Sequence, residues 1–276
     1  MENFLGKVAL VTGGASGIGL GMSRAFAARG MKIVIGDLDE TAMTAVEKEL
    51  DAGGVEVLTQ TCDVSSLDAM QALADATIER FGRLDTVCLN AGVGIPTSAR
   101  NMKLKDWEWI INVDLWGPIY GVHVFVPLLE EQDEGHINAT SSMAGLISSG
   151  MMGAYNVAKH GVVALMASLE RELRAKKSNV RASVLCPGPI NTDISRHSVE
   201  YRPGQSKPKA DGASQGKMAK SIQETLEQGM PPDEVGELVA QAIAEDKFWI
   251  LTHPPWAKAV KKQLDALVED QTLTRA

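Results

Sequence analysis

The stretch Thr12–Gly19 reads TGGASGIG, and it determines how the rest of the chain is interpreted. It follows a short apolar run at Lys7–Val11 and precedes a helical pattern that continues to Arg29. Glycines at this spacing permit a tight turn and a close approach of the backbone to a pyrophosphate, which the N-terminus of the following helix attracts. A glycine turn that only packs a helix against a strand is the alternative, which the strand–loop–helix context disfavours. The predicted cofactor contacts of this loop are Gly13, Ser16, Gly17, Ile18 and Gly19.

Asp37 ends the next apolar run, 18 residues after Gly19. A carboxylate at this position can accept hydrogen bonds from both hydroxyls of the adenosine ribose, and it repels the 2′-phosphate of NADP. Neither Leu38–Glu40 nor Ala15 in the glycine loop supplies a compensating base. The sequence therefore predicts NAD, rather than NADP, as the cofactor.

Apolar runs and helical patterns alternate along the chain. Strands are expected at Lys7–Val11, Lys32–Gly36, Val55–Thr61, Leu84–Leu89, His136–Thr140, Val180–Leu185 and Phe248–Thr252. Helices between successive strands imply right-handed crossovers and a parallel sheet. We expect an α/β fold: a single-domain, Rossmann-like, doubly wound parallel sheet of about seven strands with helices on both faces, spanning residues 1–276.

Composition excludes several classes of function. The 276 residues carry a formal net charge of −8 without a basic patch or stripe, which argues against a nucleic-acid partner. No apolar run approaches about 20 residues, so no membrane span or signal peptide is expected. The three cysteines, Cys62, Cys88 and Cys186, lie in or beside apolar runs, as reduced and buried thiols do. We therefore expect a cytoplasmic protein.

Tyr155 and Lys159 lie four residues apart in a helical stretch and so share a face. A free tyrosine has a pKa near 10, and a neighbouring ammonium favours its phenolate form. The pair is therefore a candidate general acid and base. Ser141 and Ser142 end a strand 13–14 residues earlier, at the edge where doubly wound folds bind ligands.

These motifs occur together in one order and spacing: TGGASGIG, Asn90–Gly92, Ser142, Tyr155–Lys159 and Pro187–Gly188. In this combination the chain resembles a classical short-chain dehydrogenase/reductase over about residues 4–192. The resemblance implies Asn112, Ser142, Tyr155 and Lys159 as the catalytic residues. It implies further cofactor contacts at Asp63, Val64, Asn90, Ala91, Gly92, Tyr155, Lys159, Pro187, Gly188, Ile190 and Thr192. Ser142, Met143 and Tyr155 are the expected substrate contacts, with a place in the core as the alternative for Met143.

Two positions depart from the family pattern. Leu89 stands where the first of two asparagines is usual, and Ala139 stands where an asparagine is frequent. Neither belongs to the catalytic set, so the predicted chemistry is unaffected.

The five histidines form no metal-ligand pattern, and no metal is expected. His160 is interpreted as structural. His197 is interpreted as a solvated loop residue, with a position in the lid near the substrate as the alternative.

Residues 195–217 are rich in Gly, Pro, Ser, Lys and Gln, as lids and disordered segments are. We expect a mobile substrate lid over about 193–230 and a helical C-terminal extension over about 254–271.

The stretches Val113–Leu129 and Ala154–Leu169 are apolar nearly all round, which indicates a second buried surface and a homodimer or homotetramer. Burial under the lid and the C-terminal helix is the alternative.

The predicted reaction is hydride transfer between NAD(H) and an apolar alcohol or ketone, secondary or ring-bearing, with Tyr155 as general acid and base. A fold alone leaves two alternatives open: a regulatory NAD-binding protein, or an epimerase or dehydratase with tightly held NAD.

Overall fold

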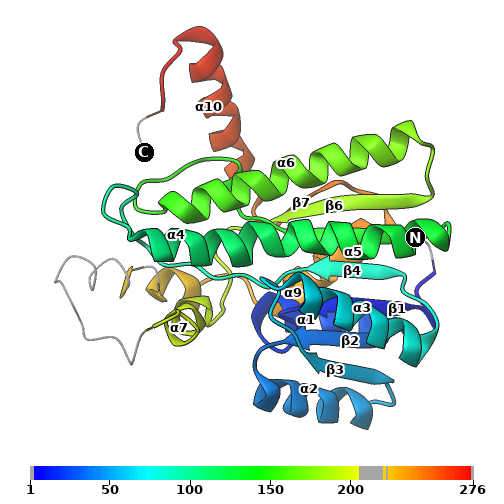
Figure 1. Ribbon diagram of the computed structural model, residues 1–276. Coiled ribbons are helices and arrows are strands. Elements are labelled where there is room, and N and C mark those ends of the chain that lie inside the picture. The colour runs from blue at the N-terminus through cyan, green and yellow to red at the C-terminus, as the bar shows by residue number, and fades with distance from the viewer. Residues whose placement is uncertain (1–2, 205–219, 222, 275–276) are drawn as a thin grey trace.

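The computed structural model describes residues 3–204, 220–221 and 223–274. Its parallel strands lie in the order β3-β2-β1-β4-β5-β6-β7 (Figure 1). They are β1 (Val8–Thr12), β2 (Lys32–Asp37), β3 (Val57–Thr61), β4 (Thr86–Leu89), β5 (Gly135–Thr140), β6 (Val180–Cys186) and β7 (Trp249–Leu251). The helices are α1 (Gly17–Ala27), α2 (Glu40–Ala52), α3 (Leu67–Phe81), α4 (Leu104–Ile111), α5 (Gly117–Glu131), α6 (Gly153–Ala175), α7 (Ile194–Glu200), α9 (Pro232–Ala244) and α10 (Ala257–Glu269). The predicted doubly wound α/β fold is confirmed.

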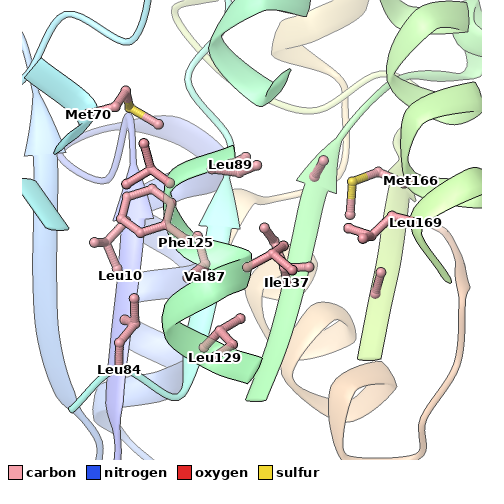
Figure 2. Close-up of a cluster of buried hydrophobic side chains, with 14 of the residues drawn as sticks. Leu10, Met70, Leu84, Val87, Leu89, Phe125, Leu129, Ile137, Met166 and Leu169 are labelled. Atoms are coloured by element: carbon pink, nitrogen blue, oxygen red, sulfur yellow. The ribbon is translucent and has the colours of Figure 1, made fainter. Parts of the chain in front are cut away.

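Successive side chains of a strand point to opposite faces of the sheet. Helices cover both faces, so the side chains on both are buried. In β1, Val8 and Leu10 pack with α3, α5 and α6, whereas Ala9 and Val11 pack with α1, α2 and α9. Phe125 of α5 lies at the centre of the first cluster (Figure 2). These two apolar layers fix the sheet rigidly between its helices.

Local signals explain where several helices begin and end. The side chain of Asp39 caps α2 by accepting a hydrogen bond from the backbone N–H of Ala42 at 2.9 Å. Ser66 caps α3 in the same way, through the N–H of Ala69 at 3.3 Å. Helix α3 ends at Gly82, whose φ of 68° is left-handed.

The strand order reverses direction between β1 and β4, which pair directly, with Ala9 opposite Thr86. At such a reversal the crossover helices leave on opposite faces, so a crevice opens beyond the carboxyl ends of the strands. This topology places the end of β1, the end of β4 and the loops that follow them around one site.

The main correction concerns residues 195–217, which the sequence predicts as one long loop. Residues Ile194–Glu200 form helix α7 instead. Ser198 on this helix is fully buried and accepts a hydrogen bond from the N–H of Gly94 at 2.8 Å, so a tertiary contact outweighs the polar composition. Residues 205–217 of the predicted lid lie outside the described residues.

Other boundaries differ only slightly. Strands β3 and β4 begin two residues later than predicted, where the pairing of Val57 with Ile33 and of Thr86 with Ala9 starts. Helix α1 ends two residues earlier than the predicted Arg29. The three cysteines are free and buried, as expected.

A single π-helical turn, Asn112–Trp116, joins α4 to α5. Turns of this kind are rare and occur often at functional sites. Helix α10 projects away from the body of the protein (Figure 1), and none of its residues is buried. Within the described part of the chain, no helix has the length and apolar character needed to cross a bilayer.

Candidate active site

One cavity of about 560 Å³ opens at the carboxyl ends of β1, β2, β4 and β5. The predicted cofactor residues that line it are Gly13, Ser16, Gly17, Ile18, Asp37, Asp63, Val64, Asn90, Ala91, Gly92, Tyr155, Lys159, Pro187 and Thr192. Gly19, Gly188 and Ile190 do not line it. Residues from the ends of these strands, and from the ends of β3 and β6, thus meet in one space, as the topology requires.

The glycine loop has the geometry that a bound pyrophosphate needs. Gly13 has a φ of +64°, and a side chain there would place its Cβ 2.9 Å from Cα of Ala91. Glycine is therefore required both by the backbone conformation and by the close approach of the loop after β4. Helix α1 begins at Gly17, which lines the cavity, and the free N–H groups at a helix N-terminus can bind an anion.

Asn90 connects three strands at the cavity floor. Its side-chain amide donates to the carbonyl oxygen of Thr12 at 3.2 Å, and its carboxamide oxygen accepts from the hydroxyl of Thr140 at 3.1 Å. The hydroxyl of Thr12 in turn accepts from the N–H of Asn90 at 2.9 Å. One asparagine is sufficient for this network, and the second family position, Leu89, is occupied by a buried apolar side chain.

Tyr155 and Lys159 lie one turn apart on α6 and face the cavity together. The Lys159 Nζ lies 5.5 Å from the centroid of the Tyr155 ring and donates a hydrogen bond to the carbonyl oxygen of Thr140 at 3.2 Å. Ser142 does not line the cavity, but its side chain lies close enough to Tyr155 to lower the pKa of the tyrosine hydroxyl. The three predicted catalytic side chains Ser142, Tyr155 and Lys159 are therefore neighbours.

The pKa values of the pair are governed by burial and by each other. Burial raises the pKa of the Tyr155 hydroxyl, and the Lys159 ammonium and the nearby Ser142 side chain only partly oppose this. Burial by itself lowers the pKa of Lys159, but the neighbouring Asp114 carboxylate and Tyr155 phenolate outweigh it, so that this pKa lies above its usual value. Lys159 is thus held as an ammonium. The predicted effect of Lys159 on Tyr155 has the expected sign, but it is smaller than the effect of burial.

Asp114 is the residue that sequence reasoning missed. It is fully buried in the π-helical turn, and its Oδ2 lies 3.4 Å from Nζ of Lys159. Its Oδ1 accepts a hydrogen bond from the N–H of Val93 at 2.7 Å. Asn112, to which the catalytic role was assigned by resemblance, is exposed at the cavity wall. A carboxylate inside the apolar run Val113–Leu129 was the available signal, because a buried charge needs a partner.

The opposite wall of the cavity comes from α4 and α7. Its side chains are Lys105, Glu108, Trp109, Ile194, His197, Tyr201 and Pro203. Sequence reasoning anticipated none of the α4 residues, and it interpreted His197 as solvated, whereas the structure places it on the cavity wall. Met143, a predicted substrate contact, is buried and does not line the cavity, because its backbone N–H is tied to the carbonyl oxygen of Pro187 at 2.9 Å.

Two contacts hold α7 and the residues after it against the cavity. The first is the hydrogen bond between Ser198 and Gly94. The second is an ion pair in which Arg202 donates through Nε to Oδ1 of Asp106 on α4 at 2.8 Å. The Asp106 side chain is 5% exposed, so this pair is nearly buried.

His160 is exposed on α6 and does not line the cavity. Its Nδ1 lies 2.9 Å from the carbonyl oxygen of Asn156 on the same helix. Among the described residues, no group of three or more His, Cys, Asp or Glu side chains is arranged to hold a metal ion.

A glycine loop, a ribose-binding carboxylate and a Tyr–Lys pair around one crevice define the class: a dinucleotide-dependent oxidoreductase. The family model of the short chain dehydrogenases matches residues 7–202. The chain belongs to the short-chain dehydrogenase/reductase family, binds a nicotinamide cofactor and acts as an oxidoreductase on CH–OH groups.

Three similar proteins illustrate the range of this family. The 1-deoxy-11-beta-hydroxypentalenate dehydrogenase of Streptomyces exfoliatus is 30% identical, over 94% of this chain and 87% of the relative. A short chain dehydrogenase/reductase from Burkholderia phymatum, solved in complex with NAD, is 36% identical with a TM-score of 0.95, covering 100% of this chain and 99% of that one. A metagenomic short-chain oxidoreductase, solved in complex with NADP, is 28% identical with a TM-score of 0.70, covering 90% of this chain and 96% of that one.

Proposed function

We propose that this protein is an NAD-dependent dehydrogenase that interconverts an apolar secondary or ring-bearing alcohol and the corresponding ketone. The observation that carries the proposal is the arrangement of Tyr155 and Lys159 at one end of the cavity, with Ser142 beside Tyr155, while the other parts of the cavity fit a dinucleotide. A regulatory dinucleotide-binding protein does not need a buried Tyr–Lys pair. The catalytic arrangement therefore favours turnover.

The side chains divide the work of proton transfer. The Tyr155 hydroxyl accepts the proton of the substrate hydroxyl during oxidation and returns it during reduction. Ser142 lies beside Tyr155 and orients the substrate oxygen. Lys159 stabilises the phenolate by its charge. Bound NAD supplies the hydride acceptor.

The residues around the cavity fit NAD. Asp37 lines the cavity at the end of β2, and its Oδ1 accepts from the N–H of Leu38 at 2.7 Å, which directs Oδ2 away from its own loop. Asp63 and Val64, after β3, line the same part of the cavity. These residues would hold the adenosine half, and the Pro187 and Thr192 segment the nicotinamide half. The NAD complex of the Burkholderia phymatum protein supports this choice of cofactor.

The proposed substrate class rests on the wall formed by α4 and α7. Trp109, Ile194, Tyr201 and Pro203 present apolar or aromatic surface to the cavity. Binding sites of this kind are mostly apolar, with few polar groups at the reacting atoms. The Streptomyces exfoliatus relative is named as a dehydrogenase of a hydroxypentalenate, which agrees with oxidation of a hydroxyl group.

The test is a panel of alcohols with NAD, followed by absorbance in the NADH band. Apolar cyclic and aryl secondary alcohols are expected to be oxidised with a higher kcat/KM than small charged hydroxy acids. A protein that binds NAD but oxidises no alcohol and reduces no ketone would contradict the proposal. Protein that is purified with tightly bound NAD would favour the epimerase or dehydratase alternative.

We also propose a homodimer or homotetramer. Trp116 and Val157, on the two helical stretches predicted to associate, are 43% and 51% exposed. The alternative cover, α10, has no buried residue. A closed symmetric oligomer would bury these side chains. Light scattering coupled to size exclusion tests this, and a monomer at micromolar concentration would contradict it.

A further inference from the structure

Asp114 lies in a buried position where an ionised carboxylate destabilises the folded protein unless it is compensated. Its side chain is 0% exposed, and no hydrogen-bond partner satisfies its Oδ2, which faces Nζ of Lys159 at 3.4 Å. A buried charge of this kind costs several kcal/mol when it is not fully compensated. An uncharged side chain could accept the hydrogen bond from Val93 equally well. Burial raises the pKa of the Asp114 carboxyl and the Lys159 ammonium opposes this, so the charge on Asp114 is tied to the charge on Lys159.

The surroundings of Asp114 contain few other titratable groups. Helix α6 contributes Lys159 and Tyr155, and Cys186 of β6, whose thiol pKa burial raises to about 12, lies near Lys159 rather than Asp114. The loop after β4 contributes backbone only, at Gly92 and Val93. The charge of Lys159 is thus shared between two potential anions, the Asp114 carboxylate and the Tyr155 phenolate.

The loop after β4 is shaped to let the three groups meet. A Cβ on Gly92 would lie 3.3 Å from Oδ1 of Asp114 and 3.3 Å from Nζ of Lys159. Glycine leaves room at the one point where a side chain would crowd both partners. The carboxylate and the ammonium are therefore held beside each other from two sides, by the π-helical turn and by this loop.

We infer that Asp114 is a positioning residue that holds Lys159 and sets the pH at which the Tyr155–Lys159 pair loses its proton. Its carboxylate competes with the phenolate for the same ammonium. The pair therefore releases its proton at a higher pH than it would beside a neutral side chain. The inference rests on the proposed function for its effect on catalysis, but not for its effect on the titration of Tyr155.

The pKa directions agree with this geometry. The Asp114 carboxylate acts to raise the pKa of Tyr155, whereas Lys159 acts to lower it. The same carboxylate is the main influence that raises the pKa of Lys159 against the effect of burial. Removal of the negative charge should therefore make the loss of a proton from the pair easier, whichever of the two residues releases it.

The decisive variant is Asp114→Asn, which keeps the acceptor for Val93 and removes the charge. Tyrosinate absorbance is titrated without substrate, and the same titration of a variant that also carries Tyr155→Phe is subtracted. The onset of the Tyr155 titration should move to lower pH by about one unit, the lower end of the effect of a neighbouring charge. In the oxidation direction, the acidic limb of the kcat/KM profile should shift by the same amount.

Asp85→Asn is the matched control. Asp85 is 1% exposed, accepts from the N–H of Val8 at 2.8 Å and is paired with Arg83, so that it resembles Asp114 in burial, backbone contact and cationic partner. It lies at the amino end of β4, away from the cavity. A loss of stability in both variants is the general effect of removing a buried carboxylate. The shift in the Tyr155 titration should occur only in Asp114→Asn.

An unchanged Tyr155 titration in folded Asp114→Asn would overturn the inference. So would an equal shift in Asp85→Asn. If Asp114→Asn does not fold, carbon-13 NMR of aspartate carboxylates in the unsubstituted protein provides the test. The chemical shift of one carboxylate should change at the pH where Tyr155 ionises, and this change should be missing in Tyr155→Phe. If no carboxylate shows such a change, Asp114 and Tyr155 are not coupled. A protein that oxidises no alcohol would contradict the proposed function and leave these titrations interpretable.

Discussion

The carboxylate of Asp37 accepts a hydrogen bond from the backbone N–H of Ala15 through Oδ2, at 3.0 Å. This bond ties the end of β2 to the glycine loop that follows β1. The carboxylate proposed to bind the ribose and the loop proposed to bind the phosphates therefore hold a fixed position relative to each other before the cofactor arrives. Such preorganisation reduces the entropy that binding must overcome.

The first prediction concerns the choice of cofactor. NAD should be preferred over NADP, because a 2′-phosphate beside Asp37 places like charges together at a cost of about 1–3 kcal/mol, roughly 5–150-fold in kcat/KM. Arg196 is not available to neutralise the 2′-phosphate, because its guanidinium is already paired with Asp193 at 2.9 Å and Glu200 at 3.5 Å. Asp37→Ala should narrow the preference. Equal kcat/KM for the two cofactors in the unsubstituted protein would contradict the prediction.

The second prediction concerns the ion pair that holds α7 over the cavity. Arg202→Met removes the partner of the nearly buried Asp106 and should loosen the segment after α7. KM for the alcohol should rise about tenfold for each 1.4 kcal/mol of binding free energy that is lost when this wall is no longer held in place. The dissociation constant of NAD should change less. Arg196→Met, in an exposed ion pair, is the control and should have little effect on KM.

Coupling between Arg202 and Asp106 can be measured directly. Adding Asp106→Asn to Arg202→Met removes the unpaired charge and should recover part of the lost stability. Unchanged KM in Arg202→Met, or simple additivity of the two substitutions in stability, would show that this ion pair does not hold the wall in place.

The third prediction concerns stability in acid. Burial lowers the pKa of the His136 imidazole from 6.5 to about 3, and its Nε2 lies 2.8 Å from the hydroxyl of Ser183. Ser183 accepts from the side-chain amide of Asn138 at 2.9 Å, so its own hydroxyl is free to donate to a neutral imidazole. Between about pH 6.5 and 3 the unfolded chain binds a proton that the folded protein does not. Stability should therefore fall with falling pH in this window, by up to about 1.4 kcal/mol per pH unit.

His136→Asn should remove this part of the acid sensitivity. Chemical denaturation at several pH values would measure it, with the exposed His123→Asn as control. If both variants retain the full slope between pH 6.5 and 4, buried His136 is not its source.

The sheet and the cofactor loop could be predicted because their signals are local. A short apolar run, a glycine spacing and a terminal aspartate such as Asp37 each carry their own physical reason within a few residues of sequence. Ser142, Tyr155 and Lys159 could be found for the same reason, since a helix face and a strand end determine where they lie. All the strands predicted on this basis are present in the structure.

The rest of the site depends on contacts between distant segments. Helix α7 forms where the composition favours a loop, because Ser198 is buried against Gly94, 104 residues away in the chain. Asp114 lies beside Lys159 only because a π-helical turn and α6 pack together. Met143 has the right sequence position for a substrate contact, but its backbone is tied to Pro187 and its side chain is turned into the core. Spacing in the sequence carries no information about such contacts.

The central claim is that Tyr155 transfers the proton in an NAD-dependent oxidation. The most direct measurement compares kcat and the dissociation constant of NAD in the unsubstituted protein and in Tyr155→Phe. Tyr201→Phe, which keeps the aromatic ring on the substrate-binding wall of the same cavity, tests whether loss of any tyrosine hydroxyl in the cavity has the same effect. We predict that Tyr155→Phe lowers kcat by roughly 10²–10⁴-fold while NAD still binds, and that Tyr201→Phe retains most of its kcat. A Tyr155→Phe protein that keeps most of its kcat with the preferred alcohol would contradict the account.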